Sequence, residues 1–148
     1  MATTTGSNVM FNSWVEYMAE AANTSSDSFI IGLTTSSWTP NQATMTVLAD
    51  VTNEVSGSGY SRQTLASVTS TLSGAVLTFD AADPVFTASG GSIVARYWFI
   101  FDDTVAGDPL VNYGLLDTTA GGTNVTTTAG NTLTFNINAS GLFTVTRS

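Results

Sequence analysis

The spacing of hydrophobic residues changes once along the chain, near residue 25. Between Asn8 and Ala22 the apolar side chains recur every three or four positions, and Ser7 precedes them as a plausible N-cap. This spacing predicts an amphipathic helix over about residues 8–22, with its apolar face on the core or on a partner. The residues of that face are Met10, Phe11, Trp14, Val15, Met18, Ala21 and Ala22.

From residue 28 onward the pattern has a period of two, interrupted by turn residues. Ile93 to Phe101 carries apolar residues on both faces, which is typical of a central strand covered on both sides. Leu110 to Leu116 is expected to return antiparallel to it. Further strands are predicted at Ser28–Thr35, Thr44–Leu48, Tyr60–Val68, Ala75–Phe79, Asn124–Thr128, Thr132–Asn138 and Leu142–Thr146, the last two as a hairpin.

Eight to ten short strands separated by loops favour an all-β fold. We predict an antiparallel β-sandwich, jelly-roll or immunoglobulin-like, over about residues 28–147, preceded by the helix. Neither a repeat nor a linker divides the sequence, so residues 1–148 are expected to form a single domain. With 43% hydrophobic residues in 148, the chain has enough apolar side chains to form a core without metals or disulfides.

The residue types that are missing narrow the possible chemistry. The chain has no cysteine and no histidine, so it has no thiolate nucleophile, no imidazole base and no usual zinc site. Asp102, Asp103 and Asp108 share one loop, but their spacing is not that of an EF-hand. A glycosidase needs two carboxyl groups at a defined separation, and no sequence cluster favours one. We therefore expect a non-enzymatic protein without a metal or cofactor.

The charge balance argues against two classes of partner. The three arginines, at positions 62, 96 and 147, are the only side-chain cations against 11 acidic residues, and the formal net charge is −8. Such a surface cannot neutralise several phosphates, so binding to nucleic acid or to an anionic membrane is not expected. No apolar run has the length of a membrane span.

Candidate contact residues are chosen because aromatic residues are enriched at protein interfaces. They are Met10, Trp14 and Met18 on the helix face, Trp38 as an exposed aromatic residue, and Tyr60 beside a Gly/Ser loop. Arg96 is the one cation in an apolar strand, and it is expected to pair with an acid of the same chain or to contact another subunit. Trp38 and Tyr113 would alternatively supply a stacking platform for a sugar.

The segment Asp50–Tyr60, with the sequence DVTNEVSGSGY, is the most distinctive part of the sequence. It occurs together with four further segments, Phe29–Pro40, Phe79–Phe86, Ile93–Tyr97 and Phe135–Val145. In these segments, and over nearly its whole length, the chain resembles a family of small virion structural proteins of tailed bacteriophages.

The resemblance implies a passive protein on the outer surface of a virion. The expected role is that of a capsid decoration or cement protein, which binds the major capsid protein and stabilises the shell. A homo-oligomer, with a trimer favoured, is expected. An alternative that the sequence leaves open is a tail or fibre-attachment protein that binds a receptor or a glycan. The acidity agrees with an outward position, because packaged DNA would repel this chain.

Overall fold

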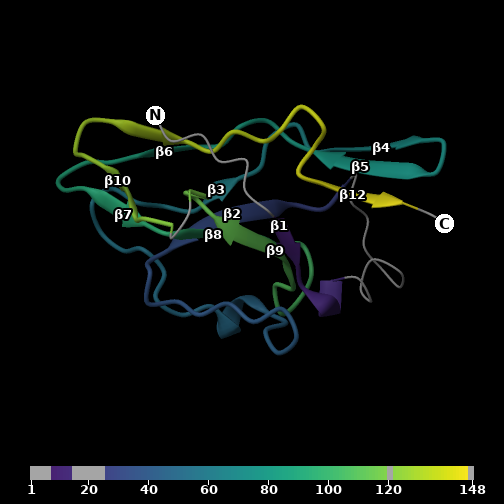
Figure 1. Ribbon diagram of the computed structural model, residues 1–148, viewed down its shortest axis with the longest axis horizontal. Coiled ribbons are helices and arrows are strands. Elements are labelled where there is room, and N and C mark those ends of the chain that lie inside the picture. Colours follow the sequence, from purple (N-terminus) through teal and green to yellow (C-terminus); the bar gives the residue numbers. More distant parts are fainter. Residues whose placement is uncertain (1–7, 15–25, 120–121, 147–148) are drawn as a thin grey trace.

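The computed structural model describes residues 8–14, 26–119 and 122–146, and most of its regular structure is antiparallel β-sheet (Figure 1). The prediction of an all-β fold is confirmed. The strands are β1 (Asn8–Met10), β2 (Phe29–Thr34), β3 (Gln63–Thr64), β4 (Thr69–Ser73), β5 (Val76–Asp80), β6 (Val85–Thr87), β7 (Ile93–Ala95), β8 (Tyr97–Asp102), β9 (Leu110–Leu115), β10 (Val125–Thr127), β11 (Thr132–Thr134) and β12 (Phe143–Thr146), and one 3-10 helix, η1, spans Leu48–Asp50.

A five-stranded sheet in the order β1-β9-β8-β2-β3 forms the centre of the molecule. Its middle strand β8 is apolar on both faces, and Trp98, Phe99, Ile100 and Phe101 are all buried. Because side chains alternate along a strand, Trp98 and Phe99 point to opposite faces. The prediction that this strand is covered on both sides is confirmed.

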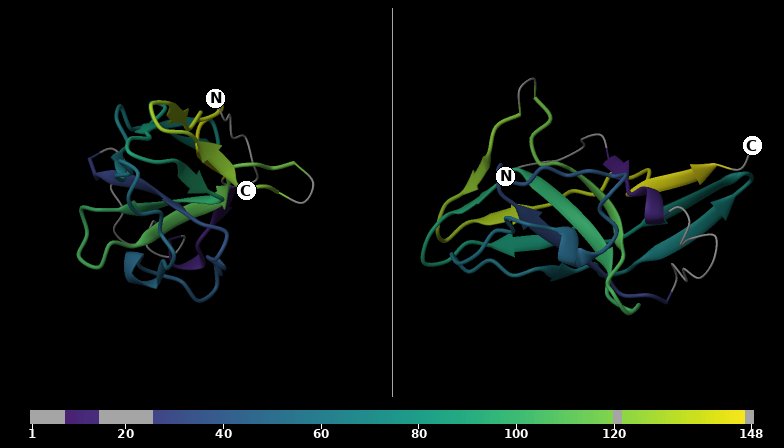
Figure 2. Two further views of the ribbon diagram at one scale, coloured as in Figure 1. Left: turned by 90° about the vertical axis from the view of Figure 1, so that its left-hand side faces the viewer. Right: turned by 90° about the horizontal axis from the view of Figure 1, so that it is seen from below.

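The remaining strands lie over one face of the central sheet (Figures 1 and 2). They form three antiparallel groups, β4-β5-β12, β6-β11 and β7-β10. Aromatic contacts join the layers, with ring centroids 5.0 Å apart both for Trp98 and Phe135 and for Phe29 and Phe79. This packing buries the largest apolar side chains of both layers.

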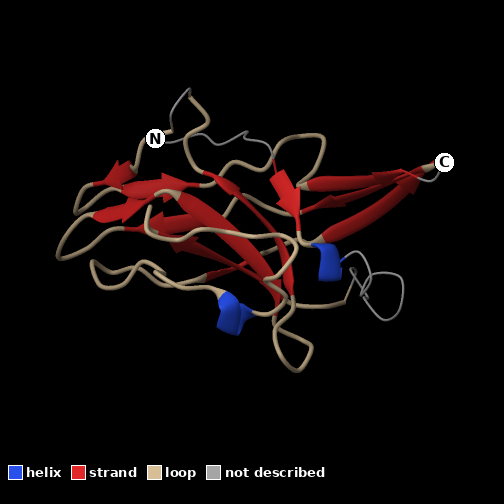
Figure 3. Cartoon of the chain, turned by 60° about the horizontal axis from the view of Figure 1, so that its bottom comes forward, coloured by secondary structure: helices blue, strands red, loops and turns tan. Residues whose placement is uncertain are grey.

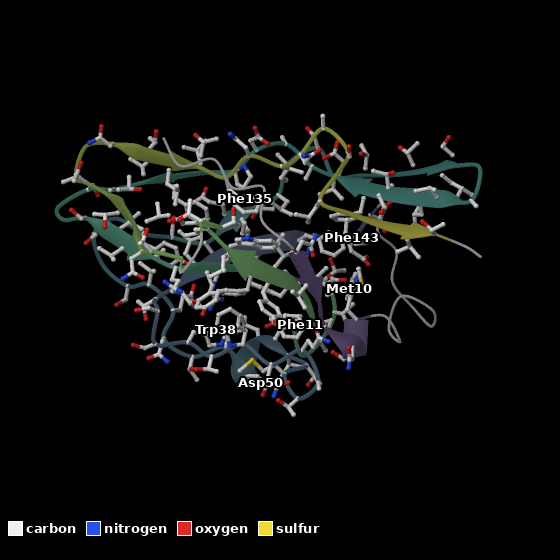
Figure 4. The ribbon with its side chains drawn as sticks, in the orientation of Figure 1. Met10, Phe11, Trp38, Asp50, Phe135 and Phe143 are labelled. Atoms are coloured by element: carbon white, nitrogen blue, oxygen red, sulfur yellow. The ribbon has the colours of Figure 1, made fainter. Side chains whose placement is uncertain are left out.

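Residues 35–60, which include η1, cover the opposite face of the central sheet (Figures 3 and 4). Trp38 packs edge-on against Tyr97, Phe99 and Tyr113, with ring centroids 5.7, 6.0 and 5.7 Å away. Figure 4 shows Trp38 and Phe11 on the side of the sheet opposite to Phe135. A segment with little regular structure therefore supplies the second cover of the central sheet.

The N-terminal prediction is wrong at residues 8–10. These residues form β1, which pairs antiparallel with β9 and places Met10 opposite Asn112. Residues 12–14 are helical, and the rest of the predicted helix, including Met18, lies outside the described residues. Pairing with β9 gives hydrogen-bond partners to the backbone N–H and C=O groups along the edge of that strand. This long-range pairing outweighs the local spacing of apolar residues, which favours a helix.

The final hairpin is also not formed. β11 pairs with β6, and β12 pairs with β5, so residues 132–146 run antiparallel to residues 76–87. The Phe135 N–H donates to the Pro84 carbonyl at 2.9 Å, and the Leu142 N–H donates to the Phe79 carbonyl at 2.8 Å. Residues 135–142 therefore connect two ladders along one long ribbon instead of closing a turn between two paired strands.

The predicted strand Ile93–Phe101 is divided at Arg96 into β7 and β8. The Arg96 N–H donates to the Thr34 carbonyl at 2.8 Å, and its carbonyl accepts from the Leu116 N–H at 2.9 Å. β7 pairs with β10, whereas β8 pairs with β2 and β9. The chain therefore changes partners at Arg96 while its backbone groups stay hydrogen-bonded.

Two other predicted strands are shorter than expected. Thr44–Leu48 contributes only an isolated bridge from Val47 to Pro109, because the Asp50 Oδ2 accepts the N–H groups of Thr46 (2.8 Å) and Val47 (3.1 Å) and holds a local turn. These bonds also hold the pKa of Asp50 below its usual value. Tyr60–Val68 is reduced to the two residues of β3.

Candidate interaction surface

The three-stranded sheet β12-β5-β4 extends away from the body of the molecule as an arm (Figures 1 and 3). β4 and β5 are joined by a two-residue turn that Ser73 and Val76 close. Gly74 is the first turn residue and has a φ of 61°, a conformation that glycine adopts without the cost that a Cβ would bring.

The two faces of the arm differ in chemistry. Phe79 and Phe143 lie opposite each other at the root, where both are buried and their rings stack 4.8 Å apart. Two positions further out on the same face, Leu72, Leu77 and Val145 stand side by side in one cross-strand row. Leu72 is 70% exposed and Val145 38%. We call Leu72, Leu77 and Val145 the distal row; it extends the apolar core beyond the body of the protein.

The opposite face of the arm is mainly hydroxylic. Thr71, Thr78 and Thr144 form the cross-strand row behind the distal row, with Val76 next to them on β5. Threonine suits the solvent-facing side of a sheet because it combines β-branching with a hydroxyl group. One face of the arm is therefore adapted to water, and the other presents apolar side chains, of which Leu72 is the most exposed.

The backbone groups of β4 point alternately toward β5 and toward the outer edge of the sheet. The Phe79 carbonyl accepts the Leu142 N–H, so the backbone groups of Phe79 point toward β12, and by alternation those of Leu77 do as well. Ser70 and Leu72 lie opposite these two residues. In such non-hydrogen-bonded pairs the groups of each residue point away from the partner strand, so the N–H and C=O groups of Ser70 and Leu72 point away from β5.

The arm carries little charge. Neither charged residues nor proline occur in Thr69–Ser73, and Asp80 at the root is the one charged residue of the three strands. Leu72 in the distal row is 70% exposed. This combination of an uncharged strand and an exposed apolar side chain makes the arm the best candidate interaction surface among the described residues.

The aromatic residues proposed from the sequence are placed differently. Trp14 and Trp38 have exposed fractions of 0% and 1%, so the expectation that Trp38 is exposed is wrong. Trp38 is enclosed with Tyr113 because residues 35–60 fold back over the sheet, and this position offers no open stacking platform for a sugar. Met10 is partly buried against the core. The structure brings none of these residues together on an open surface.

Tyr60 is the last residue of the segment Asp50–Tyr60, and its hydrogen bonds connect this segment to the central sheet. Its hydroxyl donates to the Glu54 Oε1 and accepts the Leu33 N–H, both at 2.8 Å. Arg62 donates to the same carboxylate, from Nε at 2.8 Å and from Nη2 at 2.6 Å. Burial raises the pKa of Tyr60, so the phenol keeps its proton. The cluster is structural: it attaches the loop to β2.

Arg96 is half-buried in the described structure. Its Nη1 donates to the Gly122 carbonyl, and its guanidinium lies 5.8 Å from the centroid of the Tyr97 ring. These contacts hold residue 122 beside the point where β7 passes into β8. Because Gly122 and Tyr97 belong to the same chain, these contacts give the guanidinium a role within the fold.

The acidic loop is not organised as a shared site. Asp102 is buried, and its Oδ1 accepts the Thr104 N–H at 2.9 Å, while Asp103 is exposed. Across residues 8–14, 26–119 and 122–146 no three acidic side chains come together as a group that would hold a metal ion.

A groove of about 550 Å³ lies along β10, β11 and the turn that joins them. Its lining residues are Val125, Thr126, Thr127, Thr128, Asn131, Thr132 and Thr134. The groove therefore offers hydroxyl and amide groups and carries no titratable side chain. Hydrogen bonding is the chemistry that this set of residues supports.

Leu72 is the residue that the sequence analysis missed. The strand Thr69–Ser73 was not predicted, although Leu72 and Leu77 stand symmetrically about Gly74-Ala75. A glycine at the first position of a two-residue turn is a hairpin signal, and it would have paired these two leucines across the strands.

Comparisons of the chain with protein-family models, with curated proteins and with solved structures found no match. No helix within the described residues is long and apolar enough to cross a membrane. The fold and the geometry of the arm are therefore the observations from which a function is argued.

Proposed function

We propose that this chain is a structural protein of a bacteriophage virion, a decoration protein that binds the outside of the major capsid shell and stabilises it. The observation that carries the proposal is the arm, whose exposed apolar row is suited to contacts between proteins. The sequence resemblance supports the same role. The absence of cysteine and histidine from the chain supports a role without catalysis.

We further propose that the strands form a β-sandwich of the jelly-roll or immunoglobulin-like class within a single domain. The packing of β5 and of residue Phe135 on the central sheet supports this assignment. A sandwich would hold the arm at a fixed angle to the body. Contacts made by the arm would then resist movement of neighbouring subunits.

The stabilising effect would follow from mass action. A protein that binds only the assembled shell lowers the free energy of that shell relative to its separated subunits. Each contact can be weak, because many copies act on one particle and their contributions add. The acidic surface would keep unbound copies soluble and away from the packaged DNA.

The test is a phage with the corresponding gene deleted. Particles without the protein should assemble and adsorb to host cells normally, but they should release their DNA at a lower temperature than the parent. Purified protein added back should restore the heat resistance and saturate at a fixed number of copies per particle. Unchanged heat resistance of the deleted particles would overturn the proposal.

The hydroxyl-lined groove along β10 and β11 favours a second candidate function, binding of a receptor or glycan by a tail or fibre-attachment protein. Polar groups converging in a groove are the usual means of fixing a polar ligand. The same deletion separates the two roles. Normal shell robustness together with lost adsorption would support this alternative.

A further inference from the structure

We propose that the peptide bond between Asp108 and Pro109 is a self-cleavage site, at which the chain breaks into residues 1–108 and 109–148. The bond lies in the connection from β8 to β9, where the backbone of Asp108 has a positive φ. The reaction takes place once per molecule and uses a carboxyl group and water, so it requires neither cysteine nor histidine. It is independent of the proposed capsid role.

The residue pair itself makes this bond chemically weak. Two of the three prolines of the chain follow an aspartate, in Asp83–Pro84 and Asp108–Pro109. In an aspartyl–prolyl bond the side-chain carboxyl can close a five-membered ring on the carbonyl carbon of its own residue, so the attack is intramolecular. The tertiary amide nitrogen of proline also takes up a proton more readily than other peptide nitrogens, and it leaves as a secondary amine.

The reaction balances with water as the one co-reactant. An oxygen of the protonated Asp108 carboxyl attacks the Asp108 carbonyl carbon, so that a carbon–oxygen bond forms and the carbon–nitrogen bond to Pro109 breaks. The carboxyl proton moves to the departing nitrogen, and a cyclic anhydride remains on Asp108. Water then opens the anhydride. The products are an aspartic acid at a new C-terminus and a free secondary amine on Pro109.

The fold holds Asp108 in a conformation that two rules disfavour. Its φ is 52°, in the left-handed region that residues with a Cβ rarely adopt. A following proline restricts the residue before it to extended conformations, which have a negative φ. Hydrogen bonds fix both sides of the bond: the Asp108 N–H donates to the Val105 carbonyl at 3.0 Å, and the Leu110 N–H donates to the Thr46 carbonyl at 2.9 Å. Cleavage releases this strain, so the fold favours the break.

A backbone donor is already placed at the oxygen that becomes charged. The Leu48 N–H donates to the Asp108 carbonyl oxygen at 2.9 Å. When the carboxyl attacks, this oxygen gains negative charge, and a donor fixed in advance stabilises it. Leu48 is the first residue of η1, and the preceding Val47 forms a bridge with Pro109, so the donor is held in place beside the bond.

The second bond of the same type provides a comparison within the molecule. Asp83 lies outside the left-handed region. Its Oδ1 accepts the Ile137 N–H at 2.8 Å, and this hydrogen bond holds the carboxyl group toward the neighbouring chain segment. The bond between Asp83 and Pro84 therefore lacks the strain, and its carboxyl group is engaged. We expect it to break more slowly in the folded protein.

The two fragments should stay together after cleavage. Residues 110–115 form β9, which pairs with β8 and β1 of the other fragment. Leu110 and Val111 are buried directly after the broken bond. The product is therefore a nicked molecule, which should elute as one species from a sizing column and separate into two fragments only when it is denatured.

The experiment compares the two bonds in the folded and the unfolded protein. The full chain is incubated in mildly acidic buffer with protease inhibitors, circular dichroism confirms that it is folded, and mass spectrometry after denaturation identifies the fragments. In the folded protein the bond after Asp108 should break about tenfold faster than the bond after Asp83. In the same buffer with urea the two rates should become similar. The rate constant should not depend on protein concentration, because the reaction is intramolecular.

Two matched variants test the role of the carboxyl group. Asp108→Asn keeps a residue that tolerates the left-handed region but removes the acid, so cleavage after residue 108 should slow about tenfold or more. Asp83→Asn makes the same change at the other bond and should leave cleavage after Asp108 as it is. A folded parent that stays intact, equal rates for the two bonds, or an Asp108→Asn variant that breaks as fast as the parent would each overturn the inference. The heat resistance of particles is not measured here, so the capsid role is tested separately.

Discussion

Asp102 is a carboxyl group held in an apolar setting at the end of β8. Its side chain is buried, and its Oδ1 accepts a hydrogen bond from the Thr104 N–H at 2.9 Å. Burial raises the pKa of Asp102 above its usual value, and the nearby Asp27 carboxylate raises it further, whereas the Thr104 N–H opposes the shift. The folded protein therefore favours the neutral form of this group more strongly than the unfolded chain does.

The raised pKa has a definite consequence for stability. Between the unfolded pKa of about 3.8 and the higher folded pKa, the native state binds more protons than the unfolded state, so the contribution of Asp102 to stability falls as the pH rises. Asp102→Asn should remove this dependence while keeping an acceptor for the Thr104 N–H. Its melting temperature should exceed that of the parent at neutral pH, and this difference should shrink toward pH 4.

Asp103→Asn is the matched control, because Asp103 is the exposed neighbour on the same loop. Melting temperatures of the parent and both variants, measured across this pH range, isolate the effect of Asp102 from those of other acids. Asp50, whose pKa is lowered, contributes the opposite pH dependence equally in all three proteins. A melting temperature of Asp102→Asn that follows the parent at every pH would contradict the prediction.

At the scale of the elements, the central sheet is organised by two aromatic rings that lie over glycines of neighbouring strands. Trp98 lies opposite Gly114, and a Cβ on this glycine would come within 2.7 Å of the indole. Phe99 lies opposite Gly32, where the Cβ would come within 2.3 Å of its ring. Because the two rings point to opposite faces, the pairs allow large side chains to pack closely on both sides of β8.

This close approach predicts that Gly114→Ala destabilises the protein by about 1–3 kcal/mol through overpacking. The cost should be smaller in a Trp98→Leu background, because the shorter side chain does not occupy the space above residue 114. Urea unfolding of the parent, the two single variants and the double variant gives the coupling free energy. Additive effects would show that the contact does not limit the packing.

The elements differ in how well their sequences predict them. The middle strand was predicted because the apolar run ending at Phe101 has no polar face, which leaves few alternatives. Its division at Arg96 depends on a change of partner strands, which local sequence does not encode. Similarly, the spacing of Met10 and Trp14 fits a helix. Residues 8–10 nevertheless form a strand, because they pair with the edge of β9.

The candidate surface was less predictable than the fold. Large aromatic residues such as Trp38 suit an interface and a core equally well, and here residues 35–60 bury Trp38. Leu72 is the one apolar residue of the Ser/Thr-rich segment Thr69–Ser73. The segment therefore shows no alternation of apolar and polar residues from which a strand could be predicted. Its exposure depends on where the arm leaves the body, and this is a property of the tertiary structure.

At the scale of the whole molecule, charge and shape act in opposite directions on association. Eight net negative charges spread over a small protein repel a second copy at long range. The arm extends away from the body of the protein (Figure 3), and Asp80 is the one charged residue in its three strands.

The net charge predicts how salt changes the interaction between copies of the protein. The Debye length falls from about 30 Å at 0.01 M to about 8 Å at 0.15 M salt, so added sodium chloride screens the repulsion between two acidic copies. Apolar side chains such as Leu72 carry no charge, and this salt does not screen their contacts. The second virial coefficient from sedimentation equilibrium should therefore fall as sodium chloride is added over this range. A coefficient that rose with salt would show that attraction between charged groups outweighs the repulsion of the net charges.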